Sequence, residues 1–76
     1  MALYRVMWAE GRTPIWKAGE SAAVDAVTRQ LPIGGDYVVG EWSEPNKVGT
    51  ATREIFETGL AAKLRRPVAT ITRFRS

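Results

Sequence analysis

The first thirty residues change their hydrophobic spacing from every second residue to the spacing of a helix, and this change limits the fold more than any other feature. Along residues 3–9, large apolar side chains occupy alternate positions, a pattern that predicts a β-strand. The alternating residues are Tyr4, Val6 and Trp8, with Arg5 and Met7 between them. After a turn at Gly11, residues 13–18 predict a second strand. Pro14 places that strand at an edge, because proline has no backbone N–H to donate.

The helical spacing follows directly. Ser21 stands where a side-chain oxygen can accept hydrogen bonds from the free N–H groups of a first helical turn. The next apolar residues recur three or four apart and form one stripe, consisting of Ala23, Val24, Val27 and Leu31. Pro32 disfavours helical geometry in the residue before it, so we expect this helix to end at Leu31.

The second half of the chain contains two further strand patterns. Residues 37–42 are rich in strand-forming residues, and Gly40 within them indicates a bulge or a close approach of another chain. Residues 68–74 predict a last strand, which begins after Pro67. Both strands belong to the sheet that the first hairpin starts.

Residues 48–56 between these strands fit two structures. Ile55 and Phe56 are adjacent and would point to opposite faces of a strand, so we favour a helix capped by Thr50. We therefore expect a small two-layer α+β domain with an antiparallel-rich sheet of four strands and two helices on one face, in the order β-β-α-β-α-β. The alternative makes residues 48–56 a strand before a short helix around 59–66, giving ββα-ββα-β with five strands.

The size of the chain limits it to one domain. Its 76 residues are 45% hydrophobic, which is ordinary for a globular core and too high for a disordered chain. There is no cysteine, and small secreted domains usually depend on disulfides, so we expect a protein of the reducing cytoplasm. No apolar run approaches the roughly 20 residues that cross a bilayer, so we expect no membrane association.

The side chains used in most catalysis are missing. Without histidine and cysteine the chain lacks the usual general base, the thiol nucleophile and the commonest ligands of zinc. Glu54 and Glu57 lie three residues apart, but no apolar pocket is evident that would tune them as an acid and base pair. We therefore expect no enzymatic activity, no metal site and no cofactor.

Positive charge gathers toward the C-terminus. Residues 1–62 carry a net charge of −2, whereas residues 63–76 carry +5 with no acidic residue, and the whole chain has +3. Arginine binds carboxylates and phosphates through two bonds at a time, which favours an anionic partner. Trp8 and Trp42 are expected in the core, and Trp16 is the tryptophan expected to be exposed. The candidate partner-binding residues are Arg65, Arg66, Arg73, Arg75, Trp16 and Lys17.

These features favour a module that acts by binding. We expect a non-enzymatic stoichiometric protein-binding module, an inhibitor or adaptor, whose arginine and aromatic surface meets an acidic protein surface or a nucleoprotein complex. Small phage-encoded inhibitors of host complexes share this size and composition. The alternative is a small basic nucleic-acid-binding protein that contacts phosphates through its arginine-rich C-terminal segment, in keeping with a pI of about 9.8. If the strands at the two termini are sheet edges, a homodimer could also form through them.

Overall fold

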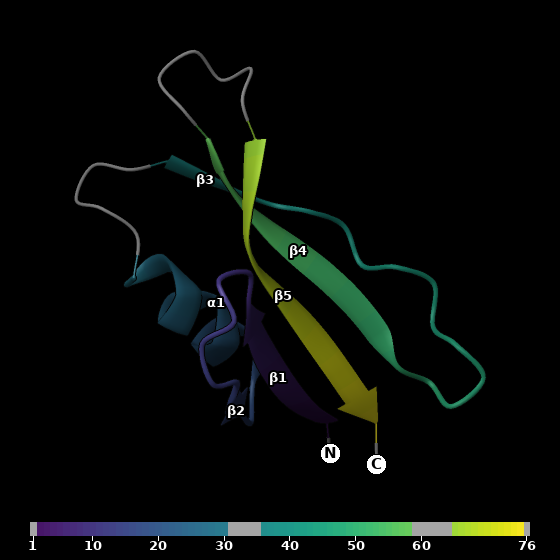
Figure 1. Ribbon diagram of the computed structural model, residues 1–76. Coiled ribbons are helices and arrows are strands. Elements are labelled where there is room, and N and C mark those ends of the chain that lie inside the picture. Colours follow the sequence, from purple (N-terminus) through teal and green to yellow (C-terminus); the bar gives the residue numbers. More distant parts are fainter. Residues whose placement is uncertain (1, 31–35, 59–64, 76) are drawn as a thin grey trace.

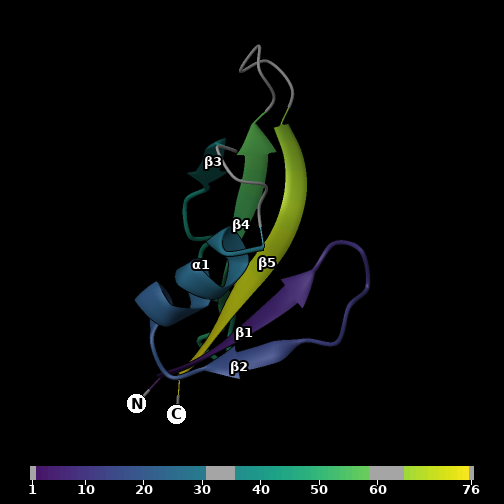
Figure 2. The same cartoon turned by 90° about the vertical axis from the view of Figure 1, so that its left-hand side faces the viewer.

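A computed structural model describes residues 2–30, 36–58 and 65–75, which form one sheet and one helix (Figure 1). The elements in chain order are β1 (Ala2–Trp8), β2 (Ile15–Lys17), α1 (Glu20–Thr28), β3 (Asp36–Val39), β4 (Ala51–Thr58) and β5 (Arg65–Arg75). The chain is thus an α+β domain, with α1 on one side of the sheet only (Figure 2).

The five strands lie in the order β2-β1-β5-β4-β3, and all neighbours are antiparallel. The edge position expected for the second strand is confirmed. The first and last strands, in contrast, are not edges: β1 and β5 pair with each other along seven residues, from Ala2 opposite Arg75 to Trp8 opposite Ala69. A homodimer formed through terminal edge strands therefore loses its structural basis.

The expected arrangement of four strands and two helices is wrong, because residues 51–58 form β4. Ile55 and Phe56 do point to opposite sides of this strand, and the register against β5 shifts between them. Ile55 is completely buried on the α1 side, whereas Phe56 is half-buried. The shift also explains how β5 tolerates Pro67, since ladder irregularities accommodate a missing N–H.

The five-strand alternative has the right number of strands. Of its short helix around 59–66, residues 59–64 lie outside the described residues, and Arg65 and Arg66 belong to β5. These two arginines therefore do not close a helix, and the last strand is longer than the expected range of 68–74.

Helix α1 is shorter than its sequence pattern suggests. Its N-cap is Gly19, without a side-chain hydrogen bond, so the capping role expected for Ser21 is wrong. Ala23 and Val27 are buried as expected, whereas Leu31 lies outside the described residues. Of the helices in the described ranges, none is long and apolar enough to cross a membrane.

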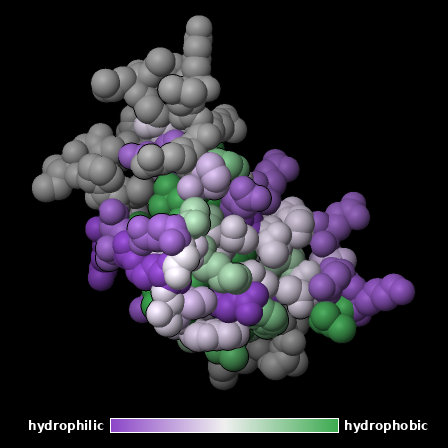
Figure 3. All heavy atoms as spheres, viewed as in Figure 1, coloured by the Kyte–Doolittle hydropathy of each residue, from purple (hydrophilic) through white to green (hydrophobic). Residues whose placement is uncertain are grey.

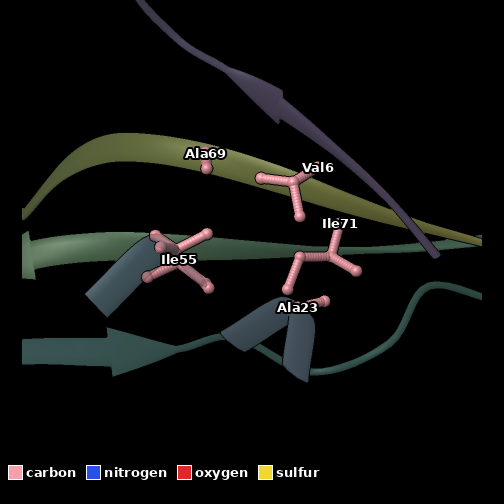
Figure 4. Packing of buried hydrophobic residues seen from close by; sticks show 6 residues of the cluster. Val6, Ala23, Ile55, Ala69 and Ile71 are labelled. Atoms are coloured by element: carbon pink, nitrogen blue, oxygen red, sulfur yellow. The ribbon is translucent and has the colours of Figure 1, made fainter. Parts of the chain in front are cut away.

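The core lies between α1 and the three middle strands. Val6 of β1, Ile71 of β5 and Ile55 of β4 are fully buried beneath the helix (Figure 4). Alanines at 23, 51 and 69 are buried with them and leave room for the helix to lie close to the sheet. Trp8 and Trp42, which are expected in the core, are only half-buried and pack against the outside of this cluster.

The segment after β3 follows β4 without forming a regular ladder. Gly40 donates a hydrogen bond to the carbonyl of Glu54 (N···O 2.7 Å), and a Cβ at Gly40 would lie only 3.2 Å from the same oxygen. The backbone that approaches Gly40 closely is thus this chain's own β4. Farther along, the side-chain oxygen of Asn46 accepts hydrogen bonds from the backbone N–H groups of Val48 and Thr50, and so closes the turn into β4.

Candidate functional site

The face of the sheet that points away from α1 carries apolar and aromatic side chains. Cross-strand pairing places Arg5 beside Trp16 on one side and Thr72 on the other, and Leu3 beside Phe74. Because side chains alternate along a strand, all of these residues lie opposite the face that buries Val6. We define the open face as Leu3, Arg5, Met7, Trp16 and Phe74.

The open face exposes large apolar side chains next to one another. Trp16 is 54% exposed, Leu3 49% and Met7 43%. They come from β1 and β2, which are adjacent strands, so they form a surface and not scattered positions. Figure 3 shows pale and light-green residues over much of one face of the molecule, with hydrophilic residues among them and at its margins. Grouped exposure of this kind is typical of a contact surface.

Arg5 is held in place by aromatic rings. The carbon at the centre of its guanidinium group lies 5.0 Å from the ring centroid of Phe74 and 5.8 Å from that of Trp16. The two rings are themselves in contact, with centroids 5.5 Å apart. The Nε of Arg5 is buried without a hydrogen-bond partner, and no carboxylate in the described ranges forms an ion pair with this side chain. The guanidinium group is therefore oriented by two rings and has no ion-pair partner among the described residues.

A second group of aromatic and charged residues lies on the α1 side, at the end of the sheet where the two termini meet. Trp42 packs against the guanidinium groups of Arg73 and Arg53, at 4.6 and 5.2 Å from its ring centroid. Arg53 also donates to the carbonyl of Gly40 and forms an ion pair with Glu20, which ties the start of α1 to β4. We call Glu20, Trp42, Arg53 and Arg73 the tryptophan cluster.

The six candidate residues from the sequence do not form one patch. Arg65 and Arg73 are eight positions apart on one strand, a separation of about 26 Å at ~3.3 Å per residue. The side chains of Arg65, Arg66 and Arg75 lie outside the described part of the chain. Trp16 is exposed as expected, whereas Lys17, its neighbour on β2, points to the opposite face of the sheet.

Most residues of the open face were not identified from the sequence, although the alternation of residues along β1 indicated them. The alternation of β1 already separated Leu3, Arg5 and Met7 from the core face. What the pattern lacked was the pairing of β1 with β5, which brings Phe74 beside them. Arg73 lies on the other face and packs on Trp42, so it does not belong to the same surface as Trp16.

Chemically, the open face can bind but offers no reactive group. Within the ranges 2–30, 36–58 and 65–75, no group of three acidic side chains is arranged to hold a metal ion. Comparisons of the chain with protein-family models, with curated proteins and with solved structures give no match.

Proposed function

We propose that this chain is a non-enzymatic protein-binding module, an inhibitor or adaptor, and that the open face is its contact surface. One observation carries the proposal: exposed Leu3, Met7 and Trp16 lie on the same face as Arg5, whose guanidinium group two aromatic rings hold in place. Tryptophan and arginine are the residue types that most often dominate the binding energy of protein interfaces.

The proposal revises the binding residues expected from the sequence. Trp16 stays at the centre of the surface, and Arg5 takes the role first assigned to the C-terminal arginines. An arginine already oriented by Phe74 and Trp16 loses little side-chain freedom when a partner binds. Its charge, with which no carboxylate of the described residues pairs, favours a partner that presents a carboxylate within an apolar surround. We place the activity in the cytoplasm, because a chain without cysteine suits a reducing compartment.

The charge of the open face favours a protein over a nucleic acid. Glu54 is exposed and pairs in register with Thr70, which in turn pairs with Met7, so its carboxylate belongs to the same side of the sheet as Arg5. The two charges cancel formally. A phosphate chain along this face would meet the carboxylate, whereas a protein partner can match both signs.

The test compares two exposed apolar positions. Immobilised wild-type protein, Trp16→Ser and Val48→Ser are used to capture partners from a lysate of the native host, and the captured protein is purified for calorimetric titration. Val48 is 76% exposed but lies in the loop before β4, away from the open face. We expect Trp16→Ser to weaken binding at least tenfold and Val48→Ser to leave it unchanged. Equal binding by all three proteins would refute the proposal.

Nucleic-acid binding remains the second candidate because exposed Trp16 beside half-buried Phe74 and Arg5 also resembles a surface on which bases stack. The two functions separate by salt dependence. Phosphate contacts release counterions, so the affinity for a single-stranded oligonucleotide should fall steeply as salt increases. We expect no such binding at low salt. Strong, salt-sensitive binding that Trp16→Ser abolishes would make the nucleic acid the partner.

A further inference from the structure

The two arginines that pack on Trp42 differ in how their charges are satisfied. Arg53 donates its Nε–H to the Gly40 carbonyl at 2.6 Å and one terminal nitrogen to Glu20. Arg73 lies closer to the ring, yet its Nε is buried without a partner. Among the described residues, no carboxylate pairs with Arg73. A buried donor without a partner is uncommon and is often explained by a water or an ion.

Arg73 also has a second cation nearby. Cross-strand pairing places Lys17 of β2, Tyr4 of β1 and Arg73 of β5 in one row on the α1 side of the sheet. Directly opposed residues in antiparallel strands lie about 4.5–5.5 Å apart, so about 10 Å separates the Cα atoms of Lys17 and Arg73. Both side chains project from this face on either side of Tyr4, whose ring centroid lies 6.3 Å from that of Trp42. Ala51 completes the row on β4, so the row contains no acidic residue.

We propose that Arg73 and Lys17 form a binding site for an oxyanion, a carboxylate or a phosphate group, on the α1 side of the sheet. Trp42 fixes the plane of the Arg73 guanidinium group, which can then offer paired N–H donors to two oxygens of the anion. Lys17 contributes a second positive charge. Arg53 takes no part, because its charge is paired with Glu20 and its Nε–H is donated to the Gly40 carbonyl.

The site is independent of the proposed protein contact. It lies on the face opposite Trp16 and uses none of the residues of the open face. A loss of binding at the open face would leave it intact, and the reverse also holds. The two proposals can therefore fail separately.

The test uses small anions and nuclear magnetic resonance. The Trp42 indole N–H and the Arg73 Nε–H are followed while sodium phosphate or sodium acetate replaces sodium chloride at constant ionic strength. We expect saturable shifts with at least one of the two anions, and the one that saturates at lower concentration identifies the preferred group. Chemical shifts that change linearly with concentration for both phosphate and acetate, without saturation, would show no specific binding and would overturn the proposal.

Three variants assign the site. Arg73→Gln should weaken anion binding at least tenfold, and Lys17→Gln should weaken it about threefold. Arg29→Gln is the matched control, because Arg29 is exposed at the end of α1 and lies outside this row. Should Arg73→Gln fail to fold, Arg73→Lys keeps the charge without the planar fork and should still weaken binding. Unchanged affinity in a folded Arg73 variant would contradict the assignment.

Discussion

Replacing valine by alanine at two positions tests whether the core lies where the structure places it. Val6 has no exposed surface and stands in one row between Ile15 and Ile71, beneath α1. Val48 is 76% exposed in the loop before β4. The same two methyl groups are removed at each site, so the difference in unfolding free energy isolates burial from the chemistry of the substitution.

The loss of unfolding free energy expected for Val6→Ala follows from the surroundings of Val6. Two buried methyl groups at ~0.8 kcal/mol each give about 1.6 kcal/mol of lost transfer free energy. The two flanking strands are held by backbone ladders and cannot close fully over the space, so a cavity term brings the expected loss to about 2–3 kcal/mol. A domain of this size has roughly 4–11 kcal/mol of stability in total, at ~0.05–0.15 kcal/mol per residue. Val48→Ala should change stability by less than about 0.5 kcal/mol.

The assay is urea unfolding followed by tryptophan fluorescence, with the free energy taken from the midpoint and slope of each transition. Val6→Ala should lower the midpoint with little change in slope, which shows that the unfolded state is unaffected. Equal losses for Val6→Ala and Val48→Ala would refute the reasoning, because the row beneath the helix would then not be the core.

Two further substitutions test the contacts that tie loops and helix to the sheet. In a double-mutant cycle, Glu20→Gln and Arg53→Met should show a coupling of about 1 kcal/mol, near the upper end for exposed pairs, since the Arg53 side chain is only 23% exposed. Urea unfolding of the four proteins measures it, and additive losses would contradict the ion pair. Asn46→Ala should cost about 1 kcal/mol because two backbone donors lose their acceptor, whereas Asn46→Asp should keep most of that stability. Equal losses in both variants would count against this role.

Local patterns were enough to predict the first strand, the edge position of the second and the burial of Ala23 and Val27 in α1. They failed at β4, because a strand that buries Ile55 on one face and half-covers Phe56 on the other has no clean alternation. They also failed on the position of β5, since pairing between residues far apart in sequence leaves no local signal. The same pairing decides the candidate site, because it separates Arg73 from Trp16 and brings Phe74 beside Arg5.

The central position of β5 has a consequence for how the protein is made. Figure 1 shows the two ends of the chain side by side, and β5 pairs with both β1 and β4. While residues 65–75 of a nascent chain have not yet emerged from the ribosome, the β1–β2 and β3–β4 hairpins are not joined. The edges of β1 and β4 that pair with β5 in the folded protein then have no partner strand. The sheet can be completed only after β5 has emerged. Until then, chaperones or neighbouring chains can bind the unpaired edges of β1 and β4.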